Sequence, residues 1–487
     1  MPSNSAPARL GRRAATATAG LIGVAVAVAL VGGGILLPWP AITAMPVSAE
    51  VSPIPSEQQR VCPGPLLSLG EDSSQAQAAA SVGDAAAVFS AREDAASTQS
   101  LPVSTSALSA VDNSAGSGSS PLKLSLPVQA GSTEAPLLAG SQSQAAATET
   151  LAGLAVAACA EATSDSWLVG GSTDVGRTSL VLLSNPTTVL ATVDLTVFGE
   201  NGAVDAPGSA GILVQPGEQR VVSLAGLAPN LRSPVVHVQS RGGQTTATIE
   251  QTSIRGIEPG GVELIAASTG PAFAQIIAGI RVLAPPAAEV SGTDAGVADG
   301  TPSVRVLVTG TEPATVQVGV TSGTGGTGGT STEVELQPGV ATDVPLVGLS
   351  AGTFSARVTS DQPIVSAART ETVGSAAKDF AWFTASEPLA DDLLVSVADG
   401  PEPVLHLVNT TATDARVTIT PEGGSRATVS VPAGAPADVP LVAGSSYVLS
   451  GMDSIVASVG YSGDGLLSSF SLRAIGPLAA PIRVYVH

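Results

Sequence analysis

A ten-residue pattern occurs three times in this chain and constrains its fold more than any other feature. The three copies are residues 215–224, 337–346 and 432–441. In each copy a glycine precedes the final leucine by seven residues, and apolar and polar residues alternate up to that leucine. The three glycines are Gly217, Gly339 and Gly434. A tight turn that leads into a half-buried strand has this pattern, so we predict three similar modules with structural turns at these glycines.

Short alternating stretches surround each copy in the same order along the chain. In each module a valine follows a turn residue by eight positions; the pairs are Asn185 and Val193, Gly310 and Val318, and Asn409 and Val417. Antiparallel strands separated by turns produce this spacing. We therefore predict an all-β chain of tandem β-sandwich (Ig-like) modules at residues 166–260, 261–378 and 379–487.

The overall charge argues against one large class of partners. The chain has 487 residues, which is too long for a single hydrophobic core, and a formal net charge of −20. Binding to nucleic acid depends on clustered lysine and arginine, yet Lys123 and Lys378 are the only lysines. We expect no nucleic-acid partner.

A long uncharged run near the N-terminus predicts a membrane segment. Residues 14–37 contain no charge and follow Arg9, Arg12 and Arg13. As a helix, this run would be about 36 Å long, enough to cross a hydrocarbon core of about 30 Å. The arginines place residues 1–13 in the cytoplasm, so the bulk of a single-pass protein would lie outside the cell membrane. The alternative is a signal peptide cleaved after Ala49, which would give a secreted protein.

Two cysteines support an extracytoplasmic location for the rest of the chain. Cys62 and Cys159 are the only cysteines, and a disulfide between them is the expected state in an oxidising compartment. Two free buried thiols are the alternative, and two cysteines without a nearby histidine do not complete a zinc site. The bond would enclose most of a variable, Ala- and Ser-rich segment at residues 51–165. We expect this segment to be a β-rich domain, with some helix around residues 75–91 or disorder as alternatives.

Three patterns that could indicate chemistry are better explained as loops. Residues 348–352 match G-x-S-x-G, but a strand pattern follows where the nucleophile elbow requires a helix. Residues 323–328 match G-x-G-x-x-G and also lead into an alternating strand. Acidic side chains are scattered through two further loops and indicate calcium only weakly. They are Asp294, Asp299, Asp391 and Asp392.

The histidines and tryptophans give no site either. His237 and His406 lie in alternating strands, where we expect them to face solvent, and His487 is the last residue. Trp167 and Trp382 stand at matching module openings, and we interpret them as core anchors. We therefore predict no catalytic residue, no metal site and no cofactor.

Several short motifs resemble a known repeat. Residues 167–173, 183–186 and 360–365 are similar to the "W-x-F-A-E-G-S", "L-x-N-P" and "S-D-x-P-I-V" segments of a β-sandwich repeat in secreted proteins of high-GC Gram-positive bacteria. With its N-terminal anchor and two cysteines, the chain resembles a family of large membrane-anchored or secreted proteins of unknown function. Gly171 replaces the acidic residue of the repeat, and the resemblance implies no activity.

These features together predict a non-enzymatic structural or interaction protein of the cell envelope. One alternative is a module that binds an envelope glycan or a partner protein. Another is an accessory subunit of an envelope-assembly enzyme. The expected membrane contact is the N-terminal helix.

Overall fold

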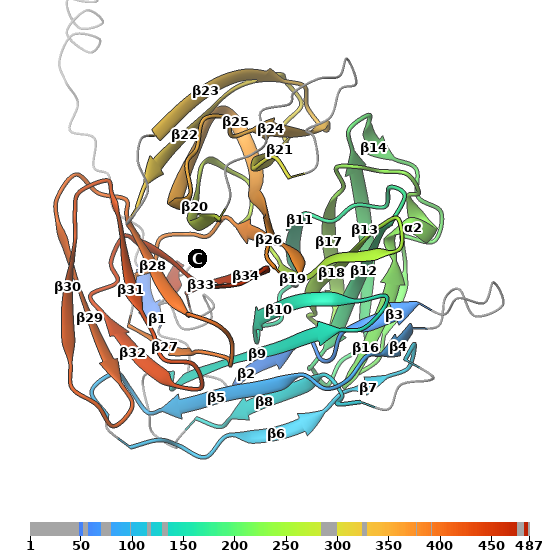
Figure 1. Ribbon diagram of the computed structural model, residues 1–487. Coiled ribbons are helices and arrows are strands. Elements are labelled where there is room, and N and C mark those ends of the chain that lie inside the picture. Colours follow the sequence, from blue (N-terminus) through green and yellow to red (C-terminus); the bar gives the residue numbers. More distant parts are fainter. Residues whose placement is uncertain are drawn as a thin grey trace, which may run out of the picture. The chain divides into compact units, whose positions relative to one another are not determined.

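The computed structural model describes residues 48–51, 57–69, 79–97, 99–113, 118–128, 135–283, 300–323, 329–375, 377–390, 392–474 and 482–485. The described part is nearly all β and contains one short helix, α2 (Leu224–Leu227), so the all-β prediction is confirmed (Figure 1). The expected anchor at residues 14–37 lies outside the described residues. Among those that are described, no helix combines the length and the apolar character needed to cross a membrane.

The chain divides into two units. One contains a two-stranded antiparallel sheet of β1 (Ser48–Val51) and β35 (Ile482–Tyr485), in which Ser48 lies opposite Tyr485. The other spans residues 53–480 and contains all the remaining sheets.

The larger unit contains three pairs of four-stranded arrangements, and the strands of each pair follow the same plan. We call each of these pairs of sheets a sheet pair. In the first sheet pair the strands of one sheet are, in order, β11 (Asp165–Val169), β17 (Val235–Gly242), β13 (Ala191–Gly199) and β14 (Gly202–Val204). Its other sheet has the order β19 (Glu258–Ala266), β18 (Thr246–Arg255), β12 (Arg177–Asn185) and β16 (Glu218–Ser223). The short β15 (Ile212–Val214) also pairs with β13.

In the second sheet pair, one long strand, β25 (Gly352–Val373), takes part in both four-stranded arrangements. The N-terminal half of β25 lies between β20 (Ala272–Val282) and β22 (Ala314–Ser322), and β23 (Gly329–Leu336) follows β22. The C-terminal half lies between β26 (Lys378–Thr384) and β21 (Ser303–Val308), and β24 (Ala341–Pro345) follows β21.

The third sheet pair repeats the plan with eight separate strands. Its first sheet has the order β27 (Leu393–Ser396), β32 (Ser446–Ser450), β29 (Ala415–Pro421) and β30 (Ala427–Val431). Its second sheet has the order β34 (Leu466–Ser471), β33 (Ile455–Gly463), β28 (Val404–Asn409) and β31 (Pro436–Pro440). Strand β19 pairs with β18, and β26 pairs with β25. Both ladders cross the module boundaries that the sequence predicts near residues 260 and 378.

The N-terminal segment forms a fourth and smaller sheet pair, with three strands in each of its two main sheets. One sheet has the order β2 (Gln58–Cys62), β8 (Leu122–Leu126) and β6 (Ser104–Ala107), and the other has the order β10 (Ala152–Ala158), β9 (Leu137–Ala147) and β5 (Ala86–Arg92). The short β3 (Leu67–Leu69) pairs with β4 (Ala79–Ser81), and β7 (Ser109–Ala110) runs parallel to β16. The helix considered over residues 75–91 is wrong where the structure describes that range, because β5 pairs along its whole length with β9. A ladder of this kind outweighs the small helix preference of alanine.

The repeated turn motif looks alike in its three copies. Gly217, Gly339 and Gly434 have φ angles of 71°, 72° and 62°, which side chains with a Cβ rarely adopt. The leucine that ends each copy is buried; these are Leu224, Leu346 and Leu441. The motif therefore joins a glycine turn to a strand or helix end that enters the core.

Two of the turn residues have the same hydrogen bonds. Asn185 donates from Nδ2 to two backbone oxygens, at 2.8 and 2.9 Å, and its Oδ1 accepts from Thr187. Asn409 does the same at 2.7 and 3.1 Å, with Thr411 as the donor to Oδ1. The second module has Gly310 at this place and lacks the amide. These asparagines hold turns and are not free for a ligand.

The last strand of every sheet pair lies at a common centre. Strands β10, β19, β26 and β34 are neighbours in a ring, each in contact with the next (Figure 1). Apolar residues of these strands, among them Leu154, Val262 and Leu467, are almost completely buried. Four segments that are far apart in sequence therefore meet around one axis of the larger unit.

One carboxylate ties this ring together. Asp379 in β26 is 1% exposed. Its Oδ1 accepts the N–H groups of Val262 (3.2 Å) and Phe380 (3.0 Å). Its Oδ2 accepts those of Leu154 (2.9 Å) and Leu467 (3.1 Å). A carboxylate offers about four lone-pair positions, so the four donors use its capacity and link all four sheet pairs.

Candidate functional site

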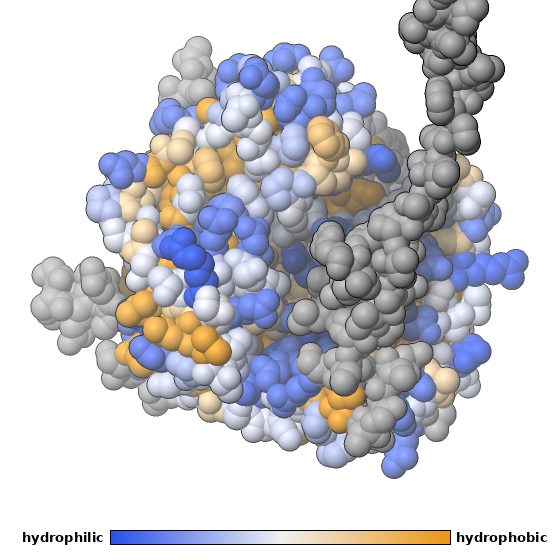
Figure 2. Space-filling view, turned by 180° about the vertical axis from the view of Figure 1, so that it is seen from behind, coloured by the Kyte–Doolittle hydropathy of each residue, from blue (hydrophilic) through white to orange (hydrophobic). Residues whose placement is uncertain are grey.

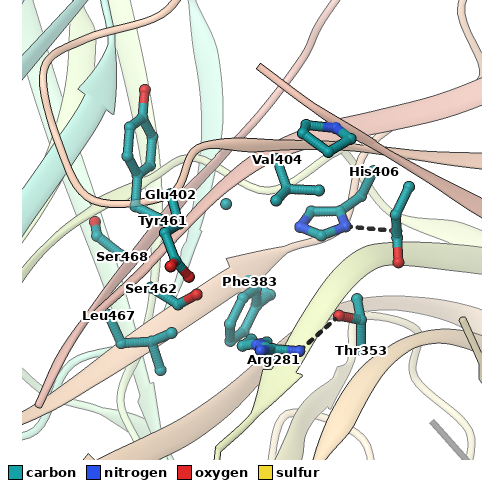
Figure 3. Close-up of a pocket in the computed structure, with 13 residues that line it drawn as sticks. Arg281, Thr353, Phe383, Glu402, Val404, His406, Tyr461, Ser462, Leu467 and Ser468 are labelled. Carbon is teal, nitrogen blue, oxygen red and sulfur yellow. Dashed lines mark hydrogen bonds and ion pairs between the residues drawn. The ribbon is translucent and has the colours of Figure 1, made fainter. Parts of the chain in front are cut away.

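A cavity of about 250 Å³ lies between the second and third sheet pairs, and we call it the His406 cavity (Figure 3). Its lining comes from β20, β25 and β26 on one side and from β28, β31, β33 and β34 on the other. It is therefore formed only where the two sheet pairs meet.

His406 and Asp438 form a buried pair in this cavity. They lie directly opposite each other in the ladder of β28 and β31, so their side chains share one face. His406 Nδ1 is 2.7 Å from an oxygen of Asp438, and His406 is 5% exposed. An ionised carboxylate only accepts hydrogen bonds, which places a proton on Nδ1 and leaves Nε2 as an acceptor in the neutral ring. Figure 3 shows this second ring nitrogen on the side of the imidazole away from the marked hydrogen bond, and it lies beside Gly460 of the cavity lining.

Two glycines make room for the imidazole. Gly279 has a φ of 75° and lies where the register of β20 with β25 shifts. A Cβ on Gly279 would lie 2.4 Å from His406 Cδ2, and a Cβ on Gly460 would lie 2.8 Å from His406 Nε2. Any side chain at either position would collide with the ring. The bulge in β20 and the glycine in β33 thus fix where His406 sits.

Arg281 and Glu402 bring opposite charges to the cavity wall. Arg281 lies opposite Thr353 in the ladder of β20 and β25 and donates to its hydroxyl at 3.2 Å. Glu402 stands between Pro401 and Pro403 and has a φ of 43°, in the left-handed region. A residue with a Cβ adopts that conformation at a cost of about 1–3 kcal/mol, which the surrounding structure must supply.

Phe383 and Tyr461 give the cavity an apolar wall. Both are almost fully buried, and the Tyr461 hydroxyl donates to the backbone oxygen of Ala398 at 3.2 Å. Burial raises the pKa of Tyr461 above its usual value. The phenol therefore stays neutral and serves as a wall, not as an acid or base.

The cavity floor connects to the buried centre through Ser468. Its hydroxyl donates to Glu263 Oε1 at 2.7 Å and accepts the N–H of Val156 at 2.9 Å. Burial raises the pKa of Glu263 well above its usual range, and the nearby Asp379 charge adds to this shift. Because the only proton of the Ser468 hydroxyl is already donated, Ser468 is not placed as a nucleophile for His406.

His406 is the one group of the lining that is oriented as a general base would be. A histidine oriented by a carboxylate can act as a general base, but it needs a nucleophile or a substrate proton within hydrogen-bond reach. Among the hydrogen bonds described for the lining, His406 bonds Asp438, Arg281 bonds Thr353 and the Ser468 hydroxyl donates to Glu263; none of these joins His406 to a hydroxyl. Within the described residues, no three His, Cys, Asp or Glu side chains gather in a way that could hold a metal ion.

The patterns that resembled enzyme motifs fall in connecting segments. Residues 348–352 lead directly into β25, a strand, so no helix follows the serine. Of residues 323–328, only Gly323 is described; it donates to Thr353 at 2.7 Å. Asp294, Asp299 and Asp391 lie outside the described residues, whereas Asp392 accepts the N–H of Gly451 at 3.3 Å.

The expectation that the strand histidines face solvent is wrong for His406. Both faces of β28 are covered, so alternation along the strand does not separate a wet face from a dry one. His237 is half-buried; it stacks on Trp167 at 4.0 Å between ring centroids and bonds Asp165 at 2.8 Å. His487 lies outside the described residues.

The predicted core anchors and the predicted disulfide are confirmed. Trp167 and Trp382 are 7% and 2% exposed, and Trp382 Nε1 donates to Gln251 at 2.7 Å. Cys62 and Cys159 are bonded to each other. The bond lies beside a β-bridge between Val61 and Ala160, so it joins the start of the N-terminal sheet pair to its end.

Comparison with known protein families assigns the chain to a family. A model described as "Family of unknown function (DUF5719)" matches residues 110–442. The chain belongs to the DUF5719 family. No curated protein matches this DUF5719 chain.

Two solved structures show limited likeness to the chain. A crystal structure of Thermotoga maritima 1070 is 15% identical, covers 24% of this chain and 95% of its own, and has a TM-score of 0.20. The BSP domain of a biofilm-associated protein is 9% identical, covers 90% of this chain and 99% of its own, and has a TM-score of 0.11. Neither likeness carries an argument about fold or function.

Sequence reasoning did not identify Arg281, Glu402 or Tyr461 as members of a site. They lie in β20, in a loop and in β33, and no motif spacing connects them. Two local signals were available: a single arginine inside the apolar strand β20, and a glutamate between two prolines. Neither signal indicates that the two residues meet.

Proposed function

We propose that this DUF5719 protein is a non-enzymatic structural or interaction protein of the cell envelope, built from tandem β-sandwich (Ig-like) modules. The observation that carries the proposal is the Asp379 carboxylate, which bonds to strands of all four sheet pairs. A chain tied in this way is a rigid support for surface loops, and rigidity lowers the entropy cost of binding a partner.

The burial pattern supports the sandwich interpretation. In the first sheet pair, Val181 and Leu183 of one sheet and Val193 and Leu195 of the other belong to one buried cluster. Two sheets that share an apolar layer form a sandwich.

The proposed location rests on the sequence together with the disulfide. A bonded cysteine pair persists in oxidising compartments, and the uncharged run at residues 14–37 follows three arginines. We therefore propose a single-pass membrane protein whose bulk is extracytoplasmic, or a secreted protein if cleavage occurs after Ala49.

Exposed apolar residues at equivalent positions support a protein partner. Val347 and Val442 directly follow the buried leucines that end two copies of the repeated motif, and they are 50% and 64% exposed. Figure 2 shows small apolar patches among polar residues on the visible face of the molecule. Repeated exposed valines at the ends of repeated strands offer a contact that one partner could make with two modules.

Photo-crosslinking in living cells tests this role. A photoreactive amino acid at Val347 or at Val442 should crosslink the same envelope component, because the positions are equivalent. The matched control is Val175, which is 82% exposed but lies in an unrelated turn. Crosslinks only to cytoplasmic proteins, or the same crosslinks from all three positions, would contradict the proposal.

A further inference from the structure

We propose that the His406 cavity binds a single neutral sugar residue. This inference deepens the interaction role proposed above and rests on it. It depends on the size of the cavity, on the hydrogen-bonding character of its polar groups, on its charge and on its fixed geometry.

The size of the cavity sets an upper limit on the ligand. Pockets for drug-sized molecules measure about 300–1,000 Å³, and the His406 cavity measures about 250 Å³. A peptide of several residues or a nucleotide is too large for this volume. One sugar ring, alone or at the end of a glycan, is of suitable size.

The polar groups of the cavity require a ligand that both donates and accepts hydrogen bonds. Arg281 can only donate, and the ionised Glu402 can only accept. In the neutral imidazole whose Nδ1 donates to Asp438, His406 Nε2 is an acceptor. A carboxylate or a fully ionised phosphate has no proton for Glu402, and an ammonium group has no acceptor for Arg281. Hydroxyl groups satisfy both, and a sugar carries several of them on one rigid ring.

Charge also favours a neutral ligand. The cavity contains two carboxylates, Glu402 and Asp438, and one guanidinium, that of Arg281. The chain as a whole carries a formal charge of −20, which repels anions at long range. Within the part of the chain that the structure describes, the Arg281 guanidinium has a hydroxyl and no carboxylate as its hydrogen-bond partner.

Apolar side chains also line the cavity. They are Phe383, which lies beside Arg281 in Figure 3, Val404 and Leu467. Small-ligand sites typically combine such a wall with a few well-placed polar groups. The C–H face of a sugar ring fits against this wall while its hydroxyls reach Arg281 and Glu402.

Two features show that the geometry is fixed in advance. His406 is held by Asp438 and enclosed by Gly279 and Gly460. Glu402 is held in a left-handed conformation at the cavity, a form of strain that gathers at ligand sites. A preorganised site loses less entropy when its ligand binds.

Titration of the purified full-length protein with methyl glycosides of neutral hexoses and pentoses tests the proposal. Saturation-transfer NMR should show saturable binding of at least one glycoside, with a dissociation constant in the millimolar range. Glu402→Gln should weaken this binding at least fivefold, because it places a donor where only an acceptor stood. The matched control is Glu312→Gln, which changes an exposed glutamate that also precedes a proline and lies outside the cavity; it should leave binding unchanged.

A second variant guards against a purely electrostatic effect. Gly460→Ala adds one methyl group in the direction of His406 Nε2 without changing any charge, and it should also weaken binding at least fivefold. Far-UV circular dichroism establishes that each variant is folded before it is titrated.

Three outcomes would overturn the proposal. They are saturable binding of no neutral glycoside, binding that neither Glu402→Gln nor Gly460→Ala weakens, and displacement of the glycoside by acetate or methylammonium at equal concentration. The envelope role proposed above, which we call the scaffold role, is tested separately by the crosslinking experiment. If Val347 and Val442 give no envelope crosslink while the glycoside binds as predicted, the scaffold role fails and the sugar site stands.

Discussion

Replacing Asp379 with asparagine shows whether one carboxylate holds the four inner strands together. Asparagine keeps the shape of the side chain but turns one oxygen into a nitrogen that donates. At Oδ2, the N–H groups of Leu154 and Leu467 would lose their acceptor; at Oδ1, those of Val262 and Phe380 would. Two buried donors are stranded in either orientation.

The expected loss of stability follows from these two donors. A buried donor without an acceptor costs about 1–3 kcal/mol, so Asp379→Asn should lower the free energy of unfolding by about 2–6 kcal/mol. That is a large part of the roughly 5–15 kcal/mol by which folded domains are stable. Urea denaturation followed by tryptophan fluorescence measures the change. The matched control is Asp414→Asn, an exposed carboxylate that accepts one N–H, from Ala433 at 3.0 Å, and it should cost less than about 1 kcal/mol.

A small effect at Asp379 would refute this reasoning. Burial raises the pKa of the Asp379 carboxyl, whereas its four N–H donors favour the ionised form. If the residue were protonated in the folded state, it would already present a donor to the ring, and asparagine would mimic it. Equal stability of Asp379→Asn and Asp414→Asn would therefore show that the carboxylate does not tie the strands as described.

Three further predictions concern stability. Burial raises the pKa of Glu250 from 4.5 to about 8, so the folded state keeps a proton that the unfolded chain releases. The contribution of this proton to the free energy of unfolding should be complete below pH 4.5 and should be lost, by up to about 5 kcal/mol, as the pH rises through 8. Denaturation curves of Glu250→Gln should lack this fall, and a pH profile identical to that of the wild type would contradict the prediction. The Cys62–Cys159 bond closes a loop with a sequence separation of 97, so its reduction should lower the free energy of unfolding, measured by calorimetry, by about 4–5 kcal/mol. If the reductant lowered the stability of a variant without cysteines by the same amount, the loop argument would fail. Asn409→Ala removes four hydrogen bonds and should cost about 2–4 kcal/mol; a cost well below that of the equivalent Asn185→Ala would show that the two turns differ.

Local sequence signals predicted the features that depend on neighbouring residues. The glycines of the repeated motif and the alternation around Val193, Val318 and Val417 indicated turns and strands because both follow from short-range backbone geometry. The disulfide followed from the presence of only two cysteines. Composition misled where it stood alone, and the alanine-rich stretch that suggested a helix contains β5.

The site could not be predicted because it is made by contacts between distant segments. Asp379 bonds to Leu154, 225 residues away, and no local pattern marks such a pair. His406 lies in an alternating strand, but a bulge in β20 at Gly279 brings a second sheet pair over it. The bonds of Asp379 and the burial of His406 both depend on how one sheet pair packs against the next.

Hydrogen exchange of four amides tests the central claim, that the sheet pairs form one tied body. The amides are those of Leu154, Val262, Phe380 and Leu467, which all donate to Asp379. In the wild-type protein they should exchange only through global unfolding, with one shared free energy equal to that from urea denaturation. Exchange of any one of them at a clearly lower free energy would mean that its sheet pair opens independently, and would contradict the claim.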